Sequence, residues 1–130
     1  MSMANALYDA GREAFLSGSL DWDADTIKLT LVDNADYTVD LAAHDFYNDI
    51  TSAGRVATSG AFTSKTTTAG VADAADVTLT SVTGDPFESI VIWEDDAGAE
   101  SADRLIAYLD TATGLPTTPN GGDSPRGYVH

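Results

Sequence analysis

Two short apolar runs separated by a polar turn lie between residues 87 and 110. The first run places Ile90 and Ile92 on one face of a strand and Val91 and Trp93 on the other. Alternation in the second run likewise predicts a strand, with Leu105, Ala107 and Leu109 on one face and Ile106 and Tyr108 on the other. Both faces of this β-hairpin are apolar, so we expect it in the middle of a sheet that is covered on both sides.

Segment 4–17 has the spacing of an amphipathic helix. Leu7, Gly11, Ala14 and Phe15 recur at helical intervals, and Gly18 follows as a natural C-terminal stop. The pattern predicts one N-terminal α-helix whose apolar side lies across a sheet.

The remaining segments favour strands and loops. Alternation in 26–33 predicts a half-buried strand with Ile27, Leu29 and Leu31 on its inner face. Residues 34–51 lack a regular period and predict a loop with one or two short helical turns. Strand-like runs cover 55–68 and 71–82, and the Pro- and Gly-rich segment 114–122 predicts a long turn.

Together these elements predict a mainly β (α+β) chain, an antiparallel β-sandwich with one N-terminal α-helix. A length of 130 residues fits a single domain, 1–130. Within it we expect the helix at about 4–17, the sandwich at about 26–113 and a short C-terminal tail at 114–130.

The charge of the chain is extreme for its length. It carries 21 acidic residues, 17 Asp and four Glu, against six basic ones, which gives a formal net charge of −15. Like charges at this density repel one another strongly at low ionic strength and are screened at about 1 M salt. We interpret the composition as adaptation to high salt.

The same charge argues against two classes of partner. Nucleic-acid binding and attachment to anionic membranes both depend on clustered Lys and Arg, so we expect neither. The chain has no cysteine and therefore no thiol chemistry. It has no signal-peptide pattern and no apolar run of membrane-spanning length, so we expect any export to proceed without a signal peptide.

The triplet Asp21, Asp23 and Asp25 has the opening rhythm of a calcium-binding EF-hand loop. The rhythm fails downstream, because Thr26 stands where such a loop needs Gly and Val32 where it needs Glu. A solvated acidic turn is the favoured interpretation, and whether a cation binds there stays open.

No catalytic, cofactor-binding or metal-binding residue is assigned from the sequence. Segment 59–66 ends like a phosphate-binding loop but lacks its glycines and the helix that should follow. His44 and His130 are far apart in the sequence, and no nucleophile motif accompanies either. Among 21 acidic residues the proximity of any two carboxylates carries little information.

The aromatic residues leave one question open. Trp93 lies in an apolar run and is interpreted as core, whereas Trp22 could be core or could stack on a ligand. Tyr37, Phe46 and Tyr47 of the irregular segment could form an aromatic contact patch.

Over nearly its whole length the chain resembles a family of small virion structural proteins of tailed viruses. The resemblance is most specific in MANALYD (3–9), GREAFLSG (11–18), DWDADTIK (21–28), LVD (31–33), RVATSGA (55–61), KTTT (65–68), GVADA (70–74) and LIAYLDTATGLP (105–116). It implies a non-enzymatic virion protein, and no catalytic residue is carried over from the family.

Two departures from the family matter. Its members continue past 120–123 into a further long strand, whereas only residues 124–130 follow here. We therefore expect an open sheet edge that a neighbouring subunit covers. Pro116, Pro119 and Pro125 cannot fill the hydrogen-bond ladder at this edge, because proline lacks a backbone N–H donor. The alternative is that residues 127–130 fold back and close the edge within the chain. The acidic composition suggests a virus of a salt-loving host such as a haloarchaeon.

The resemblance implies a role and a location for the protein in the virus particle. The protein is expected to be a capsid (head) decoration protein on the outer surface of the virion, assembled in the host cytoplasm. Expected partners are the major capsid protein or other virion subunits, with homo-oligomerisation in the particle, no nucleic acid, no membrane and no cofactor. The alternatives are a tail, baseplate or host-contact component and a small acidic ligand-binding domain.

Overall fold

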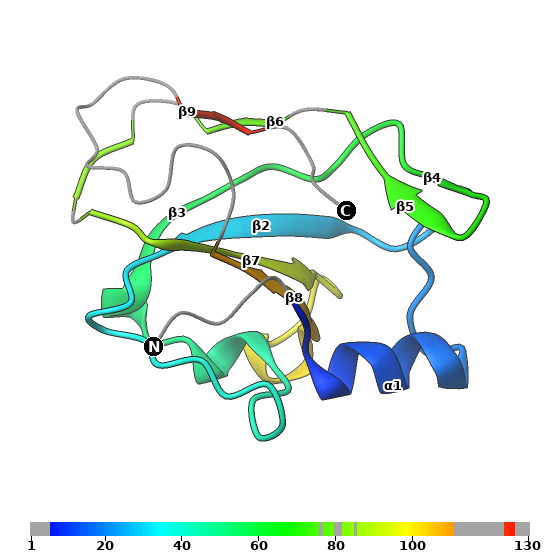
Figure 1. Ribbon diagram of the computed structural model, residues 1–130, viewed down its shortest axis with the longest axis horizontal. Coiled ribbons are helices and arrows are strands. Elements are labelled where there is room, and N and C mark those ends of the chain that lie inside the picture. The colour runs from blue at the N-terminus through cyan, green and yellow to red at the C-terminus, as the bar shows by residue number, and fades with distance from the viewer. Residues whose placement is uncertain (1–5, 76, 80–81, 85, 111–123, 127–130) are drawn as a thin grey trace.

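A five-stranded antiparallel sheet lies at the centre of the molecule (Figure 1). The computed structural model describes residues 6–75, 77–79, 82–84, 86–110 and 124–126. The strand order is β1-β8-β7-β2-β3, with β1 at Ala6–Leu7, β2 at Ile27–Val32, β3 at Arg55–Thr58, β7 at Ser89–Glu94 and β8 at Leu105–Leu109. The hairpin predicted in 87–110 is therefore confirmed, and β7 is the central strand.

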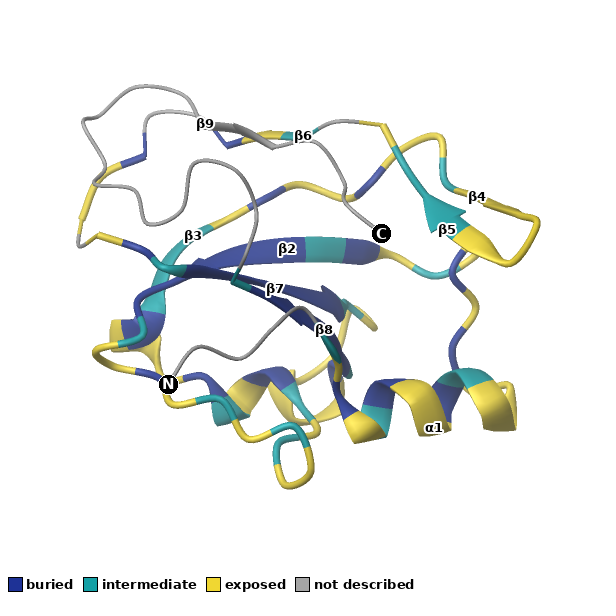
Figure 2. Ribbon diagram, in the orientation of Figure 1, coloured by how far each residue is buried: buried dark blue, intermediate teal, exposed yellow. Residues whose placement is uncertain are grey.

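Each face of the central sheet carries its own apolar cluster. Ile90 and Ile92 belong to one cluster, and Val91 and Trp93 belong to the other, as the alternation predicts. The central strands are almost entirely buried (Figure 2). The part of the chain that the structure describes is thus mainly β, with antiparallel sheets and one α-helix, as expected from the sequence.

Smaller elements cover the two faces (Figure 1). Above the sheet lie two two-stranded sheets, one formed by β4 (Thr66–Thr68) with β5 (Val71–Asp73) and one by β6 (Val77–Leu79) with β9 (Ser124–Arg126). Below it lie helix α1 (Asp9–Ser17) and the short 3₁₀ helices η1 (Tyr47–Asp49), η2 (Ser52–Gly54) and η3 (Glu100–Ala102). The predicted helical turns in 34–51 correspond to η1.

Helix α1 begins later than its pattern predicts. Residues 6–7 form β1 and pair with β8, and the Tyr8 N–H donates to the Ile106 carbonyl at 2.9 Å. These backbone groups bond to the sheet, so the predicted helix is wrong at 6–8 and confirmed at 9–17, while residues 4 and 5 lie outside the described part. Gly18 ends the helix as expected, with φ 78°.

A β-bulge in β8 overturns the predicted faces of that strand. Ile92 pairs with Ala107 and Trp93 pairs with Leu105, so Ile106 stands opposite no residue of β7. The extra residue interrupts the alternation. Leu105 consequently packs with Trp93, whereas Ile106 joins Ala107 in the opposite cluster, and the prediction that positions 105 and 107 share a face is wrong.

Three further strand predictions need correction. Segment 26–33 is buried on both faces rather than half-buried, because Thr30 and Val32 are fully covered as well as the predicted inner face. Run 55–68 is divided into β3 and β4, separated by a segment in which the Phe62 N–H bonds to the Ile27 carbonyl (2.8 Å). Run 71–82 is likewise divided into β5 and β6.

The tail pairs within the chain. In β9, Pro125 stands opposite Thr78 of β6, so the expectation that this proline stays outside a ladder is wrong. Each strand of a two-stranded sheet has an outer side that needs no donor, which is where proline is tolerated. The alternative that involves residues 127–130 lies outside the described residues, as does the turn at 114–122.

Candidate functional site

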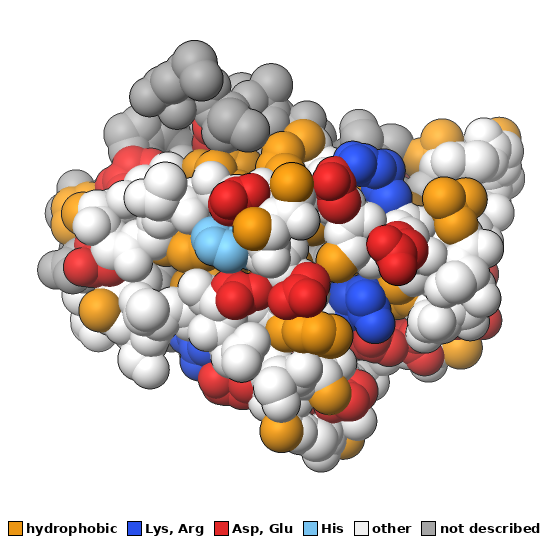
Figure 3. Space-filling model, turned by 90° about the horizontal axis from the view of Figure 1, so that it is seen from below, with side chains coloured by type: hydrophobic (Ala, Val, Ile, Leu, Met, Phe, Trp, Pro, Cys, Tyr) orange, Lys and Arg blue, Asp and Glu red, His pale blue; other side chains and the backbone are white. Residues whose placement is uncertain are grey.

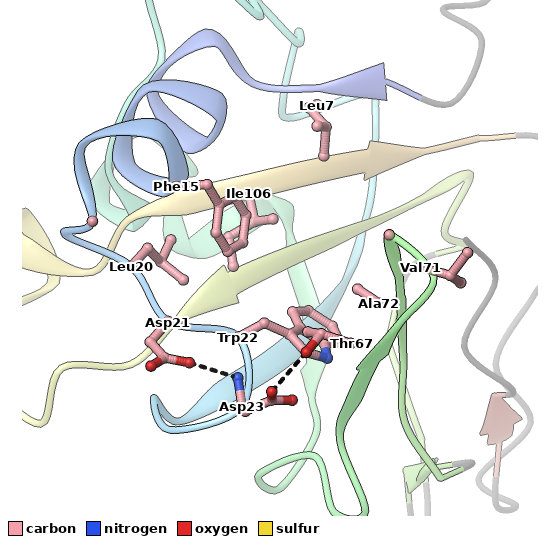
Figure 4. A pocket seen from close by; sticks show the side chains of 12 residues that line it. Leu7, Phe15, Leu20, Asp21, Trp22, Asp23, Thr67, Val71, Ala72 and Ile106 are labelled. Carbon is pink, nitrogen blue, oxygen red and sulfur yellow. Dashed lines mark hydrogen bonds between the residues drawn. The ribbon is translucent and has the colours of Figure 1, made fainter.

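An apolar groove of about 560 Å³ opens between α1 and the β4–β5 hairpin (Figure 4). Its walls come from segments that are far apart in the sequence. The lining residues are Leu7, Phe15, Gly18, Leu20, Asp21, Trp22, Asp23, Thr67, Gly70, Val71, Ala72 and Ile106.

The bulge of β8 places Ile106 in this groove. Ile106 and Phe15 both line the groove (Figure 4), and Ile106 is only 3% exposed. With regular alternation Ile106 would face the opposite cluster, so the extra residue of β8 gives the groove its apolar floor.

Helix α1 lies directly on the backbone of β8. A Cβ atom at Gly11 would stand 2.8 Å from the Leu105 carbonyl oxygen and 2.9 Å from the Ile106 Cα. Only a residue without a side chain allows this approach. The contact fixes the position of the helix, and with it the Phe15 side chain, which lies one helical turn further along the same face.

One rim of the groove is the acidic turn 21–25. The Asp21 carboxylate accepts hydrogen bonds from the backbone N–H groups of Asp23 (3.0 Å) and Ala24 (3.2 Å), and Asp25 accepts from the Asp21 N–H (2.8 Å). Such carboxylate-to-backbone hydrogen bonds by themselves hold a turn in shape. Asp21 and Asp23 are exposed, which agrees with the solvated acidic turn favoured from the sequence.

Three hydrogen bonds connect this turn to the β4–β5 segment. Thr67 donates to the Asp23 carboxylate (2.8 Å), the Trp22 indole N–H donates to the Asp73 carbonyl (3.1 Å), and Lys65 donates to the Asp25 carbonyl. The turn and the hairpin therefore form one side of the groove together. Trp22 is 4% exposed, so it is a core residue that also lines the groove.

The hairpin tip is a two-residue turn. Ala69 and Gly70 have φ of 55° and 75°, and Thr68 pairs with Val71 on either side of them. Positive φ at both central residues defines the type I′ turn that suits a β-hairpin. Glycine accepts this conformation readily, whereas alanine is strained in it.

Exposed apolar side chains gather at the groove. The large hydrophobic residues that stand exposed in the described chain are Leu7 (41%), Leu16 (89%) and Val71 (39%). Leu7 and Val71 line the groove, from opposite walls. An open apolar surface flanked by polar residues is typical of a contact site.

The charges around the groove are acidic. Among the described residues, those that line it and carry charge are Asp21 and Asp23, and no described Lys or Arg does so. On the face seen from below, acidic side chains are scattered widely and basic ones form separate small spots (Figure 3). The five basic side chains that the structure describes all contact a group of this chain: Arg12 with Asp9, Lys28 with Asp95, Arg55 with Glu100, Lys65 with the Asp25 carbonyl and Arg104 with the Phe46 ring.

A second group of acidic residues follows β7. Carboxylate oxygens of Asp95, Asp96 and Asp103 lie within 4.8 Å of one another, as they would in a cation site. Each of these carboxylates also accepts a backbone N–H bond in the loop 95–103, such as that from the Asp96 N–H to Asp103 (3.0 Å). The group therefore shapes the loop, and burial raises the pKa of Asp103 to about 6.

The aromatic contact patch expected from the sequence does not form. Tyr37 and Tyr47 are 5% and 4% exposed and pack in the cluster beneath the sheet, so two of its three members are covered. Trp93 is 4% exposed in the same cluster, which confirms its interpretation as core.

The histidine and loop motifs show no catalytic arrangement in the described residues. The Tyr37 hydroxyl lies 2.8 Å from both the Tyr8 hydroxyl and His44 Nδ1, in a buried polar network, and burial raises the pKa of Tyr37 to about 12. His130 lies outside the described residues. Segment 59–66 leads into strand β4 rather than a helix, so it is no phosphate-binding loop.

Sequence reasoning missed the groove as a site. It assigned Leu7 and Phe15 to a helix face against the sheet and gave Val71 no role beyond a strand.

Within the segments that the structure describes, no helix is both long enough and apolar enough to cross a membrane. No protein-family model matches the chain, and no curated protein is significantly similar to it in sequence.

Proposed function

We propose that the protein is a non-enzymatic structural protein of a tailed virus, and that it decorates the outside of the head by docking through the groove. The groove is the observation that carries this proposal. It combines an apolar floor with exposed Leu7 and Val71, the arrangement by which a small subunit can dock on a larger assembly.

The charge distribution supports an outward-facing role. A net charge of −15 spread over the surface keeps the protein soluble in concentrated salt and repels neighbouring copies at low salt. A decoration protein exposes most of its surface to the medium, so it can carry this charge while one apolar region stays covered.

The tail, baseplate or host-contact alternative is less well supported. It rests on an exposed aromatic patch, and two of the three residues of that patch, Tyr37 and Tyr47, are buried. Docking through the groove would serve a tail component equally well, and only its position in the particle would then differ.

A small acidic ligand-binding domain is the second candidate. A volume of about 560 Å³ lies within the range of small-molecule sites, and Trp22 with Phe15 offers aromatic surface. Thermal-shift measurements with a panel of small apolar and aromatic compounds test this candidate. A saturable rise in the melting temperature that Val71→Glu removes would favour it over the virion role.

Localisation on particles tests the leading proposal. Antibodies against the purified chain, carried on gold, are applied to particles from the culture that produces the protein. We expect regular labelling of heads. Labelling of tails would move the protein to the alternative position, and particles without label and without the protein would overturn the virion role.

A further inference from the structure

We propose that the groove binds an apolar peptide segment flanked by Lys or Arg side chains, supplied by a different protein chain. The identity of that chain as a virion subunit rests on the proposed function. The chemistry of the segment follows from the residues of the groove.

The floor and walls select apolar side chains. Ile106 and Phe15 form the floor, Trp22 closes one side, and Leu7 and Val71 flank the opening. A segment lying here would cover the 41% of Leu7 and the 39% of Val71 that are exposed to water. Removing such surface from water is the main source of affinity for a peptide in a groove.

The rim selects positive charge. Asp21 and Asp23 are exposed at the groove, and among the described residues only one oxygen of Asp23 has a hydrogen-bond partner, the hydroxyl of Thr67. A Lys or Arg beside the apolar residues of the segment would form charge-assisted hydrogen bonds with these carboxylates. An acidic segment would be repelled there.

Charge complementarity also indicates that the occupant is not a second copy. The five basic side chains described already contact groups of their own chain, so a copy would have to give up such a contact to offer one of them. Two copies, each with a net charge of −15, would also repel each other. A chain of different composition is therefore the occupant.

The two tryptophans provide the measurement. Trp22 lines the groove and Trp93 lies on the opposite face of the sheet, so 5-fluorotryptophan labelling gives one reporting and one reference ¹⁹F signal. The probes are short synthetic peptides with the same apolar centre and either Lys or Glu at both ends, and a third with Lys ends and a Ser-Gly centre. Titrations use the lowest KCl concentration at which the protein is folded and are repeated in 3 M KCl.

We expect the Lys-flanked apolar peptide to shift the Trp22 signal saturably and to leave the Trp93 signal in place. The two other peptides should bind at least about tenfold more weakly. Val71→Glu should remove binding, whereas Leu16→Glu, the same kind of change on an exposed side chain outside the groove, should not. Asp23→Asn should weaken binding at low salt more than Asp45→Asn, and the difference should vanish in 3 M KCl.

Three outcomes would overturn the inference. Equal binding of the Lys- and Glu-flanked peptides would remove the charge selection, and equal binding of the Ser-Gly peptide would reduce the effect to general attraction of cations. Concentration-dependent dimers in light scattering that Val71→Glu abolishes would make a second copy the occupant. Particle labelling is independent of all three, so labelled heads with no peptide binding would reject the groove chemistry and keep the virion role.

Discussion

The indole of Trp93 lies parallel to the phenol ring of Tyr47, with ring centroids 3.9 Å apart and planes inclined by 10°. The indole N–H also donates to Thr30 Oγ1 (3.0 Å), which in turn bonds to the Tyr47 hydroxyl (2.8 Å). Side chains from β7, β2 and η1 are thereby joined at the lower face of the sheet.

Trp93→Ala should therefore lower the free energy of unfolding by about 3–5 kcal/mol, because it leaves a cavity and removes a hydrogen bond and a stacked ring. Urea denaturation measures the change. Leu16→Ala, at a side chain that is 89% exposed, should change stability by less than about 0.5 kcal/mol. A loss below about 1 kcal/mol for Trp93→Ala would contradict the two-sided burial of β7.

Gly11→Ala should destabilise the protein although it lies inside a helix. Alanine usually stabilises a helix by about 1 kcal/mol relative to glycine. Here the added methyl group would meet the β8 backbone at 2.8 Å, and overpacking of this kind costs about 1–3 kcal/mol. Gly60→Ala, which meets nothing within 4 Å, is the control for thermal denaturation. A stabilised Gly11→Ala variant would show that α1 is not held against β8.

Ala69→Asn should stabilise the hairpin. Asparagine tolerates the left-handed backbone conformation that Ala69 adopts at φ 55°, and Asn-Gly is the preferred pair for a type I′ turn. We expect a gain of about 1 kcal/mol, comparable to the strain of an ordinary residue in this region. Ala42→Asn, at another exposed position, should give no gain in the same thermal melts. An unchanged midpoint for Ala69→Asn would contradict the turn type.

Stability should rise as the pH is lowered from 8 to about 5. Burial, together with a hydrogen bond and the charge of Asp25, raises the pKa of Glu94 to about 7. The folded state then binds a proton in a pH range where the unfolded state does not, so the stability is present at low pH and is lost as the pH rises through 7. The raised pKa of Asp103, about 6, acts in the same direction.

Glu94→Gln tests this assignment in urea melts between pH 5 and 8. It should raise the midpoint at pH 8 and flatten the pH dependence, whereas the exposed Glu13→Gln should leave the slope as it is. Hydrogen bonds from Lys28 and Arg55 lower the pKa values of Asp95 and Glu100. The stability that these two carboxylates contribute is therefore lost only when the pH falls into a more acidic range. Parallel slopes for the protein and Glu94→Gln would reject the role of Glu94.

Salt should raise the melting temperature. The chain carries −15, and ion pairs in the described residues involve only Arg12, Lys28 and Arg55. Since the Debye length falls from about 10 Å at 0.1 M to about 3 Å at 1 M, most of the rise should occur below 1 M KCl. Thermal melts from 0.1 to 3 M KCl measure it, and a midpoint that stays constant would contradict adaptation to high salt.

The strands were predictable where one face or both faces repeat with period two, as at Ile90–Trp93. The bulge at Ile106 was not, because it depends on how β8 pairs with β7 and leaves no mark in the composition of β8. Strand β1 was missed for a related reason. A pair of residues, Ala6 and Leu7, bonds to the sheet, and the helical spacing of the following residues extends across them.

The candidate site was less predictable than the fold. Leu7, Phe15 and Val71 become neighbours only through the packing of α1 and the hairpin around β8, and Val71 lies among small residues and threonines that give no binding signal. The prediction of an exposed aromatic patch was wrong because two of its three residues are buried. Tyr37 and Tyr47 look like contact residues in an irregular segment, but they fill the space beneath the sheet.

The close contact of Gly11 with β8 also determines which wall of the groove can move. Backbone lies on backbone at Gly11, so at this point no flexible side chain lies between helix and strand that could yield. The β4–β5 hairpin forms a sheet of its own, and contacts such as those of Thr67 with Asp23 and of Trp22 with the Asp73 carbonyl connect it to the acidic turn. We therefore expect a bulkier occupant to displace the hairpin rather than α1, with exchange broadening of NMR signals in β4 and β5 and unchanged signals in α1.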